Sequence, residues 1–270
     1  MIIANPIYDT VFKYLMEDTE IAKGVISRII EEEIVQLEVW NRELPKYRMD
    51  VNGLVTYLNF KAIIKKANKG YKIILIELQK AQSLKDILRL RTYWGLKSQS
   101  EESITVDGIT MTITLPIVPI YFIGSKLKQV NSPLLYVHSV QETSRPQKPL
   151  DIQEEFADQL NHDAYIIQIG CFGQTVETEL ENILKVFNQN NRSDYLYMLQ
   201  LQEQEVKENE FLVQLTDRLR YAATTCEILN HLEIEDEFER TLYRYIRERH
   251  EAEEELEKIQ SSASNECKKG

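Results

Sequence analysis

The chain has 270 residues, and its apolar and charged fractions of 43% and 28% are typical of a folded globular protein, which argues against disorder except at its end. It starts without a basic segment followed by an apolar one, and its most apolar stretch, 109–124, is interrupted by Pro116 and Pro119. We therefore expect neither a secretory signal nor a membrane-spanning helix. Three widely spaced cysteines match neither a disulfide framework nor a zinc site, which favours a soluble cytoplasmic protein.

The net charge of −11 is distributed unevenly along the chain. Residues 42–100 contain 13 basic and 4 acidic residues, a net charge of +9. The rest of the chain contains 19 basic and 39 acidic residues, a net charge of −20. A basic segment in an acidic protein is typical of a surface that contacts phosphate groups. Charge alone agrees equally well with lysines and arginines that only decorate solvated faces.

Apolar spacing predicts two helices near the N-terminus. Pro6 suits a first helical turn, and Tyr8, Phe12 and Leu15 follow it at helical intervals. A second stripe predicts a helix at 20–32, followed by a short strand at 34–39.

The region 48–82 changes to a strand pattern. β-favouring residues there surround a turn signal at 68–70, which predicts a β-hairpin. Its second arm, 71–79, contains four consecutive aliphatic residues, which suits a central strand buried on both faces.

Further along, helical and strand patterns alternate. A helix is expected at 83–98, a strand pair at 103–114 across the Asp107-Gly108 turn, and a further strand at 117–123. Residues 131–151 are expected to form mostly loop and 165–169 a last strand. Helices are then predicted at 176–187, 194–203, 208–229 and 233–260.

This order of elements predicts an α/β protein with a mixed sheet flanked by helices and a mostly helical C-terminal extension. We place the first domain at 1–174, the helical region at 175–260 and a disordered tail at 261–270. The C-terminal helices are candidates for homodimer contacts.

The end of the strand at 71–79 carries the strongest functional signal. Strand side chains alternate, so Glu77 and Gln79 share one face, and Leu78 and Lys80 point the other way. Asp50 precedes the other arm of the hairpin, and antiparallel pairing is expected to bring it across from Glu77. Two carboxylates on adjacent strands form a hard oxygen site suited to Mg²⁺. The competing interpretation is a strand that simply returns polar residues to solvent.

Four short motifs extend this signal, and with them the chain resembles the PD-(D/E)xK nuclease family transposases, also called recombination-promoting nucleases. The motifs are Asp9-x-x-Phe12-Lys13, Arg48-Met-Asp50-Val, Ile76-Glu-Leu-Gln79 and Arg89-x-x-x-Tyr93. The resemblance covers about 5–124 and implies a restriction-endonuclease-like core that cleaves DNA with Mg²⁺, for which Mn²⁺ can substitute.

The resemblance also implies roles for individual residues. Asp50 and Glu77 would hold the metal ion, and Gln79 stands where many members have the lysine that orients the attacking water. Glutamine can position a water by hydrogen bonding but supplies no positive charge. The expected catalytic residues are therefore Asp50, Glu77 and Gln79.

A second set of residues is expected to contact DNA. Arg89 and Tyr93 are spaced i, i+4 on the helix at 83–98, with Lys85 one turn earlier, so all three can face a phosphate group. Lys13 and Arg48 complete the set. Asp9 and Lys13 are also spaced i, i+4 and can instead form a surface pair.

Two functions remain open from the sequence. The first is a metal-dependent endonuclease that hydrolyses DNA phosphodiester bonds with low sequence specificity, linked to recombination or mobile elements. The second is a catalytically degenerate nuclease fold that acts as a DNA-binding or protein-interaction module, which the glutamine at position 79 and the acidic C-terminal region favour. The acidic helices could also cover the basic segment in the resting protein.

Overall fold

The structure is a computed structural model that describes most of the chain. The described residues are 1–40, 55–68, 70–81, 99–106, 109–127, 132–137, 163–172, 178–193, 195, 197–207, 209–238, 240–241, 244–245 and 248. The helix expected at 83–98 and the tail expected at 261–270 lie outside these residues.

Three elements in the N-terminal part match the predicted order. The chain starts with strand β1 (Ile2–Ala4), and then forms helices α1 (Asp9–Met16) and α2 (Thr19–Ile30) and strand β2 (Ile34–Val39). Asp18 caps α2 with its side chain, which accepts hydrogen bonds from the N–H groups of Glu20 and Ile21. The two predicted helices and the strand at 34–39 are therefore confirmed, whereas β1 was not predicted.

Two hairpins follow, and their paired strands end on either side of the turns that the sequence indicated. The first joins β3 (Val55–Lys65) and β4 (Tyr71–Ala81), and the second joins β5 (Gln99–Val106) and β6 (Ile109–Ile123). The later strands are β7 (Leu134–Val137), β8 (Ala164–Gln168) and β9 (Met198–Gln200). The later α-helices are α5 (Glu179–Leu184), α6 (Glu203–Lys207) and α7 (Glu210–Ala222), and residues 226–238 are also helical.

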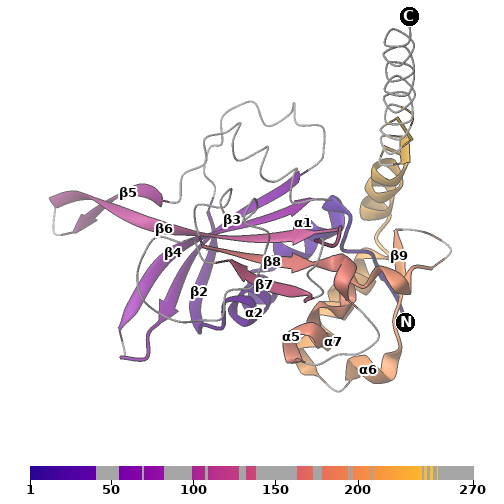
Figure 1. Cartoon of the computed structure of the whole chain (residues 1–270), viewed down its shortest axis with the longest axis horizontal. Coiled ribbons are helices and arrows are strands. Elements are labelled where there is room, and N and C mark those ends of the chain that lie inside the picture. Colours follow the sequence, from indigo (N-terminus) through magenta and orange to yellow (C-terminus); the bar gives the residue numbers. More distant parts are fainter. Residues whose placement is uncertain are drawn as a thin grey trace, which may run out of the picture.

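Seven strands form one mixed sheet in the order β2-β3-β4-β6-β8-β7, with β5 paired to β6 (Figure 1). β4 is antiparallel to β3 and parallel to β6, and β6 is parallel to β8. The strand predicted to be central and buried on both faces is thus confirmed as β4. The coarse prediction of an α/β fold with a mixed sheet and helices packed on it is confirmed as well.

The expected break between strands at 103–114 and 117–123 does not occur, because β6 runs without interruption through Pro116 and Pro119. Pro116 pairs with β5, one residue before the β4 ladder begins at Ile117. Pro119 pairs with β4, one residue before the β8 ladder begins at Ile120. Each proline therefore lies where one side of β6 is unpaired, and a missing N–H on that side costs no ladder hydrogen bond.

Three predictions for the C-terminal half are wrong in part. The helix expected at 208–229 ends at Ala222, and the next helix already begins at residue 226 instead of 233. β7 lies inside the expected loop at 131–151, and β9 lies inside the expected helix at 194–203. β7 pairs with β8, and β9 pairs with β1 at the other end of the chain. Both strands are short and are held by distant partners, so a local sequence pattern does not reveal them. β8 is consequently not the last strand.

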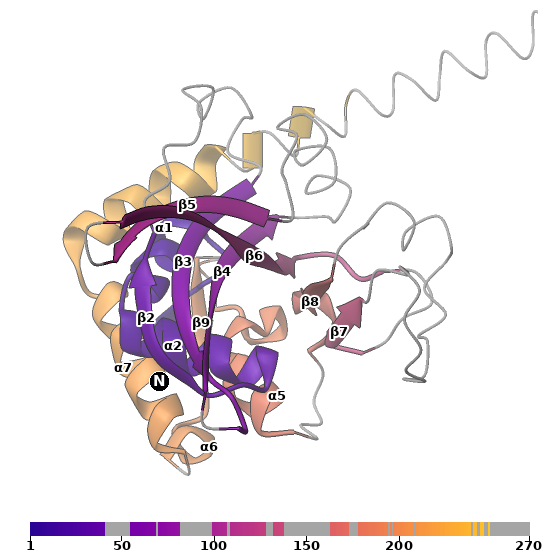
Figure 2. The ribbon, with the colours of Figure 1, turned by 90° about the vertical axis from the view of Figure 1, so that its left-hand side faces the viewer.

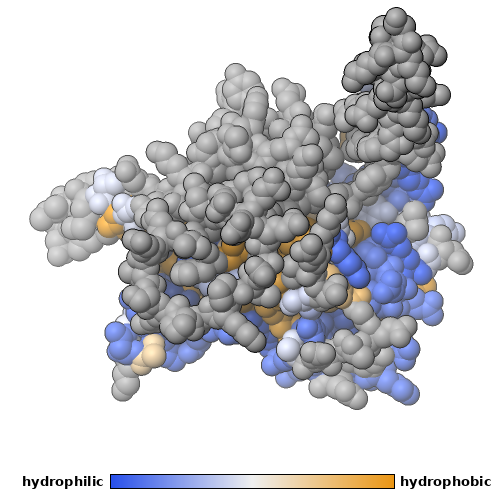
Figure 3. All heavy atoms as spheres, viewed as in Figure 1, coloured by the Kyte–Doolittle hydropathy of each residue, from blue (hydrophilic) through white to orange (hydrophobic). Residues whose placement is uncertain are grey.

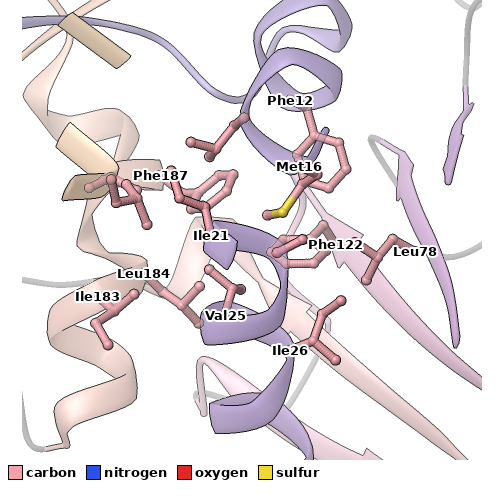
Figure 4. Packing of buried hydrophobic residues seen from close by; sticks show 14 of the residues in the cluster. Phe12, Met16, Ile21, Val25, Ile26, Leu78, Phe122, Ile183, Leu184 and Phe187 are labelled. Atoms are coloured by element: carbon pink, nitrogen blue, oxygen red, sulfur yellow. The ribbon is translucent and has the colours of Figure 1, made fainter. Parts of the chain in front are cut away.

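The main core lies on one face of the sheet. Figures 1 and 2 show α1 and α2 against the strands, and contacts join both helices to α7. In Figure 4, Val25 and Ile26 of α2 lie between the strands and the segment that carries Leu184 and Phe187. The Phe12 and Phe122 rings meet edge to face with centroids 5.2 Å apart.

The C-terminal helices share this core with the N-terminal half. The apolar stripe predicted at 208–229 is buried in α7 at Leu212, Leu215 and Leu219. These leucines belong to the same cluster as Phe12 and Ile26. The domain boundary at 174 and 175 stays a prediction, but residues on both sides of it pack into one hydrophobic core.

The outer surface differs between regions. In Figure 3, the described side chains over α5, α6 and α7 are mostly hydrophilic, and apolar side chains show near the centre, over the strands. Within the described ranges, no helix combines the length and apolar content needed to cross a bilayer.

Candidate functional site

Glu77 and Gln79 lie side by side on the central strand β4. Their side chains share one face, and Gln79 Nε2 donates to Glu77 Oε2 over 3.4 Å. Glu77 is 5% exposed and Gln79 0%. The predicted common face is confirmed, and the pair is more deeply buried than polar residues at a strand end usually are.

The β3–β4 ladder places Asn59, rather than Asp50, directly across from Glu77. The prediction that antiparallel pairing brings Asp50 across from Glu77 is therefore wrong in its register, and Asp50 itself lies outside the described residues. The turn at 68–70 contained the necessary signal, because Lys65 faces Tyr71 and counting back along both arms leads to Asn59 and Glu77.

Two amide oxygens in this region are buried and have no hydrogen-bond partner among the residues that the structure describes. Asn59 is 8% exposed, and its Oδ1 has no hydrogen-bond partner in the described part of the chain. The same holds, for the described residues, of Gln79 Oε1. Because an ionised carboxylate only accepts hydrogen bonds, Gln79 must turn its NH₂ group toward Glu77, so Oε1 is the atom left without a partner in the described structure.

These side chains fit a hard cation. Carboxylate and amide oxygens are the ligands that Mg²⁺ prefers, and Glu77, Asn59 and Gln79 offer such oxygens on one face of two adjacent strands. No group of three or more His, Cys, Asp or Glu side chains placed to hold a metal occurs among the described residues. Among the described residues, the oxygens beside Glu77 that could bind a metal are those of the amides Asn59 and Gln79, and the predicted Asp50 lies outside these residues.

Lys80 lies on the opposite face, as the alternation predicts. Its Nζ is 2.5 Å from Asp9 Oδ1 and also donates to the carbonyl oxygen of Ile7. The side chain of Lys80 is 8% exposed and that of Asp9 22%. Lys80 thus points away from Glu77, and Asp9 is paired with Lys80 rather than with Lys13.

The helix at 226–238 closes over the start of α1. The N–H groups of Asp9 and Thr10 donate to the carboxylate of Glu235, at 3.0 Å for Thr10. The Tyr8 hydroxyl donates to the buried Asp236 Oδ1 over 2.6 Å. No local sequence pattern indicates these contacts, since they join residues more than 220 positions apart.

Several lysines of the basic segment are bound to acidic residues outside it. Lys65 Nζ is 2.9 Å from Glu33 Oε2, and Lys72 Nζ is 2.6 Å from Glu32 Oε2. The Glu33 hydrogen bond raises the pKa of Lys65. With Lys80, three described lysines of the segment are therefore in ion pairs, which reduces the local positive charge.

The predicted DNA-binding residues are described only in part. Lys13 is exposed on α1. The other four, Arg48, Lys85, Arg89 and Tyr93, lie outside the described residues.

Fold and site together define an α/β protein with a mixed sheet whose central strand carries a buried carboxylate–amide pair. The chain matches no protein-family model, no curated protein and no solved structure.

Proposed function

We propose that the chain is a metal-dependent DNA endonuclease of low sequence specificity that is related to the PD-(D/E)xK nuclease family transposases and linked to recombination or mobile elements. The observation that carries the proposal is the buried Glu77–Gln79 pair on β4, next to unpartnered amide oxygens in the described structure. Such a cluster of oxygen acceptors suits Mg²⁺ or Mn²⁺.

The residues of the site have separate tasks in this proposal. Glu77, with Asp50, holds the metal ion. The ion, when bound, acidifies a water and stabilises negative charge on the phosphate oxygens. Gln79 Nε2 orients the Glu77 carboxylate, and its free Oε1 accepts a hydrogen bond from the attacking water. Lys13, Arg48, Lys85, Arg89 and Tyr93 contact the DNA backbone.

Cleavage of supercoiled plasmid tests the proposal directly. We expect the purified wild type to nick and linearise DNA with Mg²⁺ or Mn²⁺ and to be inactive with EDTA. Asp50→Ala and Glu77→Gln should abolish cleavage, and Glu38→Gln, which changes an exposed acid on β2, should not. Cleavage by both site variants at the wild-type rate would contradict the assignment.

A degenerate, non-catalytic module is the second candidate, and two observations favour it. Glu77 and Gln79 are almost fully buried, and three described lysines of the basic segment are already bound to acids. Thermal unfolding separates the two functions, because a ligand that binds only the folded state raises the midpoint. A nuclease should be stabilised by Mn²⁺, and this effect should disappear in Asp50→Asn. A binding module should not respond to the metal.

The proposed partners are DNA and a second copy of the chain. Ile234, Phe238 and Tyr245 are exposed apolar residues whose spacing places them on one face of a helix. A homodimer through this face would suit double-strand cleavage. Light scattering of the wild type and Phe238→Ser tests this, since only the wild type should have twice the monomer mass.

A further inference from the structure

Asn59 occupies an unusual position for an uncharged polar residue. It lies in the middle of β3, directly across from Glu77 on the central strand. Its Oδ1 is buried and, as far as the described residues reach, accepts no hydrogen bond. An unpaired buried polar atom costs about 1–3 kcal/mol, so a native chain normally keeps one only where a ligand or water completes it.

The surroundings of Asn59 indicate what could complete it. Side chains directly across an antiparallel ladder have Cβ atoms only ~5 Å apart, so Oδ1 lies within reach of the same ion or water as the Glu77 carboxylate. Gln79, two residues further along β4, adds a second unpartnered oxygen on this face in the described structure. Both Glu77 and the two amide oxygens are acceptors, so a bound cation is electrostatically favoured at their meeting point.

We propose that Asn59 is a metal ligand whose Oδ1 binds, together with Glu77, the divalent cation of the site. The inference rests on the proposed function, because it adds a ligand to the metal that the endonuclease requires. It extends that function by assigning one oxygen from β3 to the metal ion. The sequence motifs give Asn59 no role.

Mn²⁺ binding to the full-length protein tests this inference without any measurement of DNA cleavage. Affinity is measured by calorimetry, and thermal midpoints are recorded in EDTA and in Mn²⁺. The variants are Asn59→Ala, Asn59→Asp and Glu77→Gln, with the exposed Asn190→Ala as a matched control. Asn59→Ala should weaken Mn²⁺ binding by ~10–100-fold, and Asn190→Ala should leave it unchanged.

Asn59→Asp gives a second, independent result. Two carboxylates facing each other across the ladder repel, so the midpoint in EDTA should fall below that of the wild type. Mn²⁺ should then raise the midpoint more than it does in the wild type, because the aspartate is a stronger ligand. If Asn59→Ala does not fold, this variant decides: a metal response no larger than that of the wild type overturns the inference.

The outcomes separate the inference from the proposed function. Wild-type affinity in Asn59→Ala, together with lost affinity in Glu77→Gln, overturns the role of Asn59 and leaves the metal site of the endonuclease intact. A wild-type protein that binds neither Mn²⁺ nor Mg²⁺ overturns both. The inference is supported if Asn59→Ala and Glu77→Gln both lose affinity for Mn²⁺ and Asn59→Asp recovers it.

Discussion

At the scale of single residues, Lys80 shows how a charged side chain is held inside the fold. It pairs with Asp9 at 2.5 Å and donates to the backbone of Ile7, which ties the end of β4 to the start of α1. Removing one partner of a buried pair leaves the other charge without compensation, which is more costly than losing a pair on the surface.

We therefore expect Lys80→Met to lower the free energy of unfolding by about 2–3 kcal/mol. This loss is smaller than the ~3–5 kcal/mol for breaking a fully buried pair, because Asp9 keeps some contact with water. Urea denaturation measures this change. Lys72→Met, which breaks the more exposed pair with Glu32, is the control and should cost less than about 1 kcal/mol. The double variant Lys80→Met/Asp9→Asn should be less destabilised than the sum of its single changes. Additive effects would show that the two residues are not coupled.

A second residue-scale feature is the close approach of α2 and α7 at Gly24. A Cβ placed there would lie 2.2 Å from Phe211 Cε2, and the Phe211 ring also packs under Arg28 with 4.5 Å between Arg28 Cζ and the ring centroid. The glycine is thus required by packing within a helix that would otherwise prefer alanine.

Gly24→Ala should destabilise the wild type by about 1–3 kcal/mol, because overpacking outweighs the gain of ~1 kcal/mol in helix propensity. In a Phe211→Ala background the clash is absent, so the same change should stabilise the protein. Thermal or urea unfolding of the wild type, the two single variants and the double variant tests whether the effect of Gly24→Ala on stability changes sign. A change of the same sign in both backgrounds would contradict it.

At the scale of elements, α1 depends on a carboxylate from the far end of the chain. Tyr8, the residue before α1, donates a hydrogen bond from its hydroxyl to Asp236. The Glu235 carboxylate accepts hydrogen bonds from the N–H groups of Asp9 and Thr10. A carboxylate at a helix N-terminus satisfies free N–H groups and interacts favourably with the helix dipole.

Glu235→Ala should therefore cost about 1–2 kcal/mol of stability, similar to the loss of a helix cap. Glu237→Ala is a matched control, since it removes the same charge from an exposed position of the same helix and should change stability by less than about 0.5 kcal/mol. Urea denaturation of both variants gives the comparison. Equal effects would show that net charge, not the contact with α1, is responsible.

At the scale of the whole molecule, the C-terminal part belongs to the core. β9 pairs with β1, and the leucines of α7 pack in the same cluster as α1 and α2. The C-terminal half is therefore part of the folded core, and the hypothesis that its acidic helices cover the basic segment stays a prediction.

A chain that ends at Gln174 should lose its cooperative thermal transition and any DNA cleavage, because it lacks β9 and exposes the apolar faces of α1 and α2. A chain that ends at Glu248 keeps every described core residue and should unfold with nearly the wild-type midpoint. Calorimetry distinguishes the two. A cooperative transition in the shorter chain would show instead that the first 174 residues fold alone.

Features that depend on neighbouring residues could be predicted from the amino-acid sequence alone. Helical spacing located α1, α2 and α7, four consecutive aliphatic residues identified β4 as central, and alternation put Glu77 and Gln79 on one face. Contacts between residues that are distant in sequence became visible only in the folded chain. β1 and β9 exist because they pair across the chain, and Pro119 remains in a strand because one side of β6 is open there. The packing of α1 against β4 likewise made Asp9 the partner of Lys80, whereas the residue facing Glu77 follows from the turn at 68–70. The physical reason is that periodicity reports which face a side chain takes, whereas its partner is set by strand pairing and burial between segments that are far apart in sequence.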